Sequence, residues 1–360
     1  MPSISALGSV SFAWLHAHAG FSFEESYFLD PAVRFRQDAA INSFLDERFP
    51  NDPVYNFEAG LVQAEGRTRP VMLVGGLQPN LILGAALGAQ FVFYGDKDPD
   101  ITPAPLADAD AADRLRQTDW AQVWPVELFL RQLAELRESG PPGYALIPPF
   151  FWDVTGRATI HGVLTTAQKL VGEQVFVDIM ERPDSAFDLL EAIADAYERL
   201  IRLCSEAAGL PVTGLHVGEC SGCMIGPEAF EAFVLPVLNR MADRIGPVRL
   251  HTCGPSDHLI ESFTKVRRLA ALNVGSGTSV RSIRRHLPDL RIDVIPDTTW
   301  ITSQTMREVG AWVRATIDEN AGGPLQFQYH IDLGQPVANF LQIHRTLREL
   351  GFECGRRRLF

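Results

Sequence analysis

Apolar and polar positions follow two different periods along the last two thirds of the chain. From about residue 140 onward, short apolar runs typical of β-strands alternate with long amphipathic stretches typical of helices. The strand-like runs cover residues 144–148, 214–218, 248–251, 270–274, 292–295 and 325–329. The helical stretches cover residues 185–208, 227–245, 305–319 and 337–350. This alternation predicts repeated βα units around a parallel sheet.

Two further strand-like runs, at residues 10–15 and 71–74, complete a set of eight expected strands. Eight such units predict an α/β fold in which one domain, residues 1–360, closes into a (β/α)₈ TIM barrel. An open, doubly wound sheet is the alternative. No Gly-x-Gly-x-x-Gly or Gly-x-x-x-x-Gly-Lys loop follows a predicted strand, so the common modes of nucleotide binding are not supported.

Polar residues gather where the predicted strands end, which is the catalytic face of such a barrel. These strand ends carry His216 to Cys220, His251 to Cys253, Asn273, Asp297, and Tyr329 to Asp332. His251 and Cys253 are two residues apart, so on a strand they project from the same face, as two ligands of one metal must. Zinc accepts this mixture of nitrogen and sulfur most readily. The alternative is a buried strand end with a hydrogen-bonded histidine and a small apolar thiol.

Composition narrows the class of protein. The formal net charge of −12 argues against a nucleic-acid groove, because phosphate binding needs clustered basic residues and the only basic cluster is Arg356 to Arg358. That tail is interpreted either as solvated or as a contact to a partner chain. The second interpretation is compatible with a homo-oligomer. No secretory signal and no apolar run of membrane-spanning length occur, and the five cysteines are too few and irregular for a disulfide framework. These features predict a cytoplasmic protein with reduced thiols.

Several motifs together resemble the uroporphyrinogen decarboxylase superfamily. In the second half they are Glu219 on a strand, residues 225–230 (Ile-Gly-Pro-Glu-Ala-Phe) with Pro236 downstream, residues 251–254 (His-Thr-Cys-Gly), and residues 336–339 (Pro-Val-Ala-Asn). In the first third they are residues 27–31 (Tyr-Phe-Leu-Asp-Pro), 86–89 (Ala-Leu-Gly-Ala) and the stretch 98–103. The resemblance spans almost the whole chain. It implies a single barrel with N-terminal helical decoration and a site at its mouth.

The superfamily contains two chemistries. True uroporphyrinogen decarboxylases need no metal and grip a polyanionic substrate with an arginine-bearing segment near the N-terminus. Here the corresponding residues 12–20 contain no arginine. The chain therefore looks more like the zinc-dependent methyltransferases, which move methyl groups between a small substrate and a corrinoid or thiol acceptor. A metal-assisted decarboxylase, lyase or hydrolase on the same barrel is the alternative.

The resemblance also implies a third metal ligand. The family's distant cysteine falls at Tyr329 or His330, so the expected zinc ligands are His251, Cys253 and His330, with an open fourth position. Glu219 is expected as a fourth ligand and acid or base, or as a carboxylate that orients His251. Cys220 and Cys223 form a Cys-x-x-Cys in a glycine-rich loop, so contact of Cys220 with the metal is a further alternative.

The remaining site candidates come from the same comparison of patterns. His16 and His18 lie where the decarboxylases bind substrate, and on a strand they would share one face. His18 and Asp297 are therefore expected as catalytic residues, and His16, Tyr329 and Trp152 as substrate-binding residues. The chain has no corrinoid-binding Asp-x-His-x-x-Gly motif, so a cobalamin would be free or carried by a partner corrinoid protein. The other expected partner is a small-molecule substrate.

Overall fold

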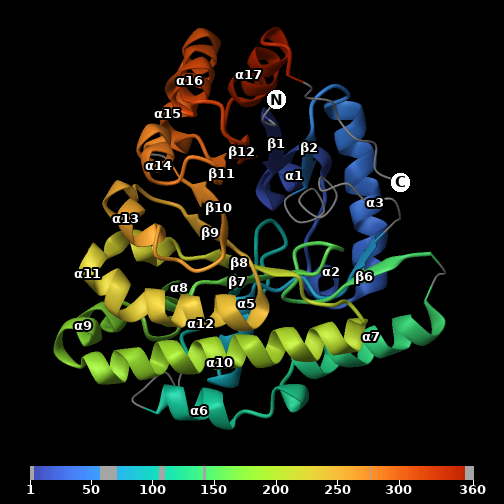
Figure 1. Cartoon of the computed structure of the whole chain (residues 1–360). Coiled ribbons are helices and arrows are strands. Elements are labelled where there is room, and N and C mark those ends of the chain that lie inside the picture. Colours follow the sequence, from blue (N-terminus) through green and yellow to red (C-terminus); the bar gives the residue numbers. More distant parts are fainter. Residues whose placement is uncertain (1–3, 57–70, 105–109, 141–142, 276, 353–360) are drawn as a thin grey trace.

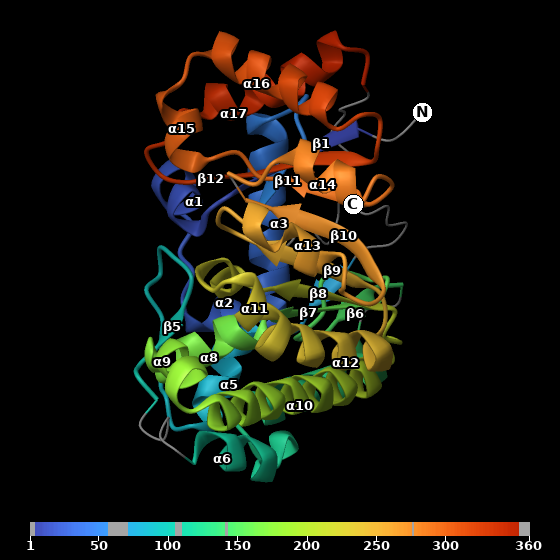
Figure 2. The same ribbon diagram turned by 60° about the vertical axis from the view of Figure 1, so that its left-hand side comes forward.

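The computed structural model describes residues 4–56, 71–104, 110–140, 143–275 and 277–352. A curled sheet of eight parallel strands forms its centre, in the order β2-β1-β12-β11-β10-β9-β8-β7. Its strands are β1 (Ile4–Val10), β2 (Val54–Asn56), β7 (Arg157–His161), β8 (Gly214–Gly218), β9 (Val248–Thr252), β10 (Leu269–Val274), β11 (Arg291–Val294) and β12 (Leu325–Ile331). Helices cover the outer face of this sheet (Figures 1 and 2).

Two short strand pairs accompany the large sheet. The parallel pair joins β3 (Val71–Leu73) to β6 (Ala145–Ile147), and the antiparallel pair joins β4 (Phe91–Val92) to β5 (Asp100–Ile101). Residues of β3 and β6 line the same cavity as residues of β1, β7, β8, β9 and β12. The β3–β6 pair therefore completes the wall on the open side of the curled sheet. This arrangement confirms the predicted α/β TIM-barrel class.

The helices follow the strands in the βα alternation that the sequence predicts. They are α1 (Phe12–Ala19), α2 (Glu25–Leu29), α3 (Pro31–Arg48), α5 (Pro79–Ala86), α6 (Ala111–Gln117), α7 (Val126–Ser139), α8 (Val163–Val171), α9 (Gln174–Glu181), α10 (Pro183–Ala208), α11 (Pro227–Ala229), α12 (Leu235–Ile245), α13 (Ile260–Phe263), α14 (Val280–His286), α15 (Thr298–Ser303), α16 (Met306–Glu319) and α17 (Val337–Glu349). None of the helices in the described ranges has the length and apolar character that crossing a membrane requires. The basic tail at Arg356 to Arg358 lies outside the described residues.

Local sequence explains where these elements begin. The α16 helix starts at a capping box, because Thr305 accepts from the Glu308 backbone while the Glu308 carboxylate accepts from Thr305. In β12 the side chains alternate between buried and half-buried, so Tyr329 faces the core while Gln328 and His330 face the barrel interior. This strand therefore supplies the site through its even-numbered residues.

One predicted strand is wrong. Residues 10–15 end one strand and begin a helix, because the Ser11 side chain accepts the Trp14 backbone N–H and caps α1. His16 and His18 consequently lie on a helix, where residues two apart do not share a face. His16 Nδ1 bonds to the Phe21 carbonyl, and His18 bonds to the Trp14 carbonyl and stacks on its indole.

Candidate metal centre and substrate cavity

A cavity of about 430 Å³ lies inside the barrel near the carboxyl ends of the strands. Its wall is largely apolar and includes the aromatic residues Phe150, Phe151 and Trp152, which follow β6. Trp152 was a predicted substrate-binding residue, and the structure places it here, 4.7 Å from the His216 ring between centroids. An enclosed apolar wall with a few convergent polar groups is typical of small-molecule sites.

Three metal-ligating side chains converge at the mouth of this cavity. The ligand atoms of Cys220, His251 and Cys253 all lie within 4.8 Å of one another. The two Sγ atoms are 2.7 Å apart, and His251 Nε2 is 3.0 Å from Cys253 Sγ. The pattern His-x-Cys thus places both side chains together, as the strand geometry predicts. The third member is Cys220, from the short turn Cys220–Met224 that follows β8.

The chemical state of this cluster suits a cation. His251 Nδ1–H donates to the Asn273 carbonyl at 3.2 Å, which leaves Nε2 directed at the cluster and able to bind a metal. Hydrogen bonds from Cys220 and then His251 lower the pKa of Cys253 to about 4, although burial opposes them. The bond to Cys253 raises the pKa of Cys220. These opposite shifts favour the thiolate on Cys253 over that on Cys220.

Cys220 is held in place by its neighbours in the chain. The Glu219 backbone N–H donates to the His251 carbonyl at 2.8 Å, and the Ser221 N–H donates to Thr165 Oγ1 at 3.0 Å. The Glu219 carboxylate accepts the backbone N–H groups of Leu164 and Thr165 at the start of α8. Both residues that flank the thiol are therefore tied to other elements.

These contacts correct the expected role of Glu219. Its carboxylate is 1% exposed, is absent from the described cavity lining and does not bond to His251. It caps the first turn of α8, where the free N–H groups and the helix dipole favour a carboxylate. Burial nevertheless raises the pKa of Glu219 to about 7, against the lowering effect of its bonds to Thr165 and Leu164.

His330 and Tyr329 occupy different sides of the barrel wall. His330 lines the cavity and bonds through Nδ1 to Ser9 Oγ at 2.9 Å, but it is outside the three-residue cluster. The third residue of the cluster that could hold a metal ion is therefore Cys220 and not His330, the ligand expected from the resemblance. Tyr329 borders the cavity, yet its hydroxyl points outward and pairs with His344 Nε2 at 2.6 Å. Its aromatic side chain therefore supports α17 rather than a substrate.

The other predicted site residues lie elsewhere. Asp297 accepts the Trp300 backbone N–H at 2.6 Å and caps α15. Neither Asp297 nor His16 nor His18 is among the described residues that line the cavity. Asp297 was placed at the site because it follows a strand, but at that position it starts the next helix.

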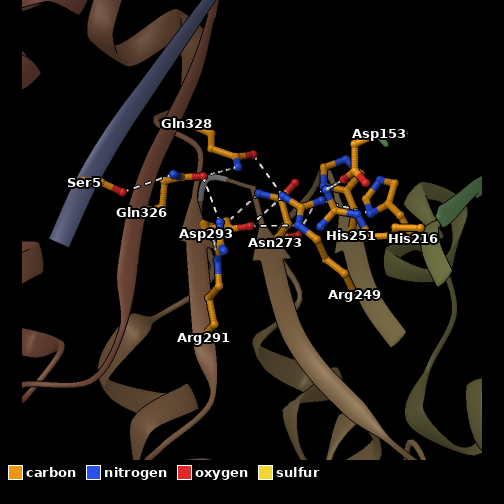
Figure 3. A network of polar contacts seen from close by, with 11 residues as sticks. Ser5, Asp153, His216, Arg249, His251, Asn273, Arg291, Asp293, Gln326 and Gln328 are labelled. Atoms are coloured by element: carbon orange, nitrogen blue, oxygen red, sulfur yellow. Dashed lines mark hydrogen bonds and ion pairs between the residues drawn. The ribbon is translucent and has the colours of Figure 1, made fainter. Parts of the chain in front are cut away.

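Sequence reasoning missed a polar floor beneath the cluster. Arg249 lies on β9 two residues before His251, is 7% exposed, and bonds to Asp293, His216 and Gln328 (Figure 3). A charged residue within the apolar run 248–251 was the available signal, because it shares a face with His251. His161 also lines the cavity, and its buried Nδ1 has no hydrogen-bond partner among the described residues.

The geometry defines an α/β barrel with a Cys–His–Cys cluster that could hold a metal ion at the carboxyl ends of its strands. The model of the family "Uroporphyrinogen decarboxylase (URO-D)" matches residues 79–299, more than half of the 360 residues. The chain belongs to the uroporphyrinogen decarboxylase family, which confirms the resemblance seen in its motifs. No curated protein matches it significantly.

Solved structures share the fold at low sequence identity. A methyltransferase from Methanosarcina mazei superposes with a TM-score of 0.61 at 13% identity, over 97% of this chain and 94% of that chain. A putative vitamin-B12 independent methionine synthase from Listeria monocytogenes gives a TM-score of 0.38 at 14% identity, covering 61% and 67%. The homocysteine methyltransferase MmuM from Escherichia coli gives 0.23 at 14% identity, covering 64% and 90%. The likeness to the first extends over the whole barrel.

Proposed function

We propose that this protein is a zinc-dependent methyltransferase or demethylase that moves a methyl group between a small substrate and a corrinoid or thiol acceptor. The observation that carries the proposal is the convergence of Cys220, His251 and Cys253 at the mouth of an enclosed cavity. Two sulfurs and one nitrogen are a donor set that zinc prefers. Zinc bound there would stabilise the deprotonated heteroatom that gives or receives the methyl group near neutral pH.

The chain's own residues would hold and shield this chemistry. The Asn273 carbonyl fixes the ring orientation of His251, and the contacts of Glu219 and Ser221 fix Cys220. The aromatic wall that includes Trp152 excludes water from the substrate side. The methyl carrier would approach from the open mouth, as a free corrinoid or as part of a separate corrinoid protein.

The alternative, a metal-assisted decarboxylase, lyase or hydrolase, depends on a carboxylate that shuttles a proton and on a third ligand with less thiolate charge. Glu219, the expected proton carrier, is engaged at the start of α8. Cys220 rather than His330 stands in the metal-ligating cluster. Both observations favour methyl transfer, because a thiolate-rich zinc site suits the activation of a thiol nucleophile more than that of water.

The test uses the full chain, purified with and without a chelator. Zinc content is measured, and demethylation of methylcobalamin by a simple thiol is followed through the loss of the methyl–cobalt absorption. We expect bound zinc and zinc-dependent demethylation, both lost in His251→Ala. His258→Ala is the matched control, because this exposed histidine bonds to the Ile225 carbonyl and lies outside the cluster. Absence of bound zinc, or equal turnover after chelation, would contradict the proposal.

A further inference from the structure

Apart from the two thiols of the cluster, the titratable side chains that line the cavity are basic or aromatic, whereas the chain as a whole is acidic. The protein has 44 acidic and 32 basic residues, yet the described lining contains no Asp or Glu. It contains Arg249 and four of the nine histidines, at positions 161, 216, 251 and 330. Arg249 and Arg291 share the single carboxylate of Asp293, so this group of side chains keeps one net positive charge beside the cavity. In a low-dielectric cavity an anionic ligand group would experience that charge strongly.

Strand register places the polar lining groups in two layers. His161 pairs with Gly218, and Gly218 pairs with His251, so these three residues form the upper layer. Because Gly218 has no side chain, a gap separates the two imidazole rings. His216 pairs with Arg249 and forms the lower layer. Arg249 and His251 are two residues apart on β9, which separates the layers by about 6.6 Å. The metal-ligating cluster therefore lies one step above a basic floor.

Hydrogen bonds fix which atoms the floor offers. Arg249 Nη1 lies 2.9 Å from His216 Nδ1, and because a guanidinium can only donate, Nδ1 must accept. An Nδ1 that accepts carries no proton, so the ring carries its proton on Nε2. Among the described residues His216 bonds through Nδ1 to Arg249, and its ring lines the cavity. His216 thus offers a donor of fixed orientation beside a buried arginine.

We infer that the substrate carries a single carboxylate, bound in the lower layer by His216 Nε2–H and the charge of Arg249. Its methylated or methyl-accepting heteroatom then lies in the upper layer beside the cluster, joined to the carboxylate by about three bonds of aliphatic chain. Asp293 lies outside the described lining and pairs with both Arg249 at 2.7 Å and Arg291 at 2.9 Å, which keeps the Arg249 guanidinium fixed without cancelling the whole positive charge. This assignment rests on the proposed function. It orients the reacting heteroatom of the substrate toward the mouth of the cavity.

The test compares two probes that differ only in charge. Binding of 3-mercaptopropionate and of 3-mercaptopropionamide to the zinc-loaded full chain is measured by isothermal titration calorimetry. We expect the carboxylate to bind at least about tenfold more tightly, the lower bound for a hydrogen bond to a charged group. Equal affinity for the acid and the amide would overturn the inference.

Variants separate recognition from a structural role. His216→Gln can accept from Arg249 and still donate into the cavity, so it should retain the preference for the acid, whereas His216→Phe should abolish it. A purely structural role would weaken both probes equally. If His216→Phe does not fold, the double variant Arg249→Met with Asp293→Asn, which removes both charges of the pair, should lose the preference. Arg291→Met is the matched control, because Arg291 pairs with Asp293 but lies outside the lining.

The same titrations with metal-free protein distinguish this inference from the proposed function. A preference for the acid in a protein that does not bind zinc would refute the metal chemistry and leave the carboxylate subsite standing. Zinc binding with no preference between the two probes would refute the carboxylate subsite and leave the metal chemistry standing.

Discussion

The choice of third metal ligand gives the sharpest prediction, because Cys220 and His330 both line the cavity but only Cys220 belongs to the cluster. Zinc binding to a protein site releases about 10–16 kcal/mol, so one of three ligands accounts for about 3–5 kcal/mol. Cys220→Ala should therefore weaken zinc binding by about two to four orders of magnitude. His330→Ala should change the zinc affinity less than about threefold, because its bond partner is Ser9.

Zinc affinity is measured by competition with a chromophoric chelator, at a pH where the cluster holds its thiolate. Cys223→Ala is the matched control, since Cys223 lies in the same turn but its thiol donates to the Cys220 carbonyl and not to the cluster. A large loss in His330→Ala together with a small loss in Cys220→Ala would refute the reasoning and restore the ligand set expected from the family pattern.

Three further predictions concern expected site residues whose polar groups bond to other parts of the fold. The pKa of Glu219 is raised to about 7 in the folded protein, above its value in the unfolded chain. Between these two pKa values the folded state binds more protons than the unfolded state. The free energy of unfolding of the metal-free protein should therefore fall by about 3 kcal/mol as the pH rises through that range. Glu219→Gln should flatten this dependence in urea denaturation, and an unchanged slope would count against the assignment. Tyr329→Phe should cost about 1–3 kcal/mol of stability by leaving His344 unpaired, with zinc affinity unaltered. Asp297→Ala should lower stability by about 1 kcal/mol through loss of the α15 cap, and any loss of bound zinc would contradict that role.

The sequence predicted the parts of the molecule that depend on short-range periodicity. The alternation in β12 gives both its strand character and the inward direction of His330, and the spacing of His251 and Cys253 gives their shared position. The prediction of a strand at residues 10–15 was wrong because that apolar run fits both a strand and a short helix. The side-chain cap from Ser11 decides for the helix.

Roles that depend on contacts between distant elements could not be read from spacing. Cys220 reaches the cluster from a turn that is bonded to α8. The contact joins Glu219 to Leu164, which lie 55 residues apart along the chain. Glu219 and Asp297 both follow strands, but at that position a carboxylate can face the cavity or cap a helix. Only the direction of the side chain distinguishes the two, and tertiary contacts determine it.

The anchoring of Glu219 and Ser221 has a consequence for how the centre is assembled. Because their bonds to β9 and α8 hold the turn that carries Cys220, little chain entropy is left to lose when an ion arrives. Metal binding should then be fast, because the site is already formed and does not have to fold around the ion. Amide hydrogen exchange in residues 219–221 should accordingly be as slow in the apoprotein as in the metal-loaded form.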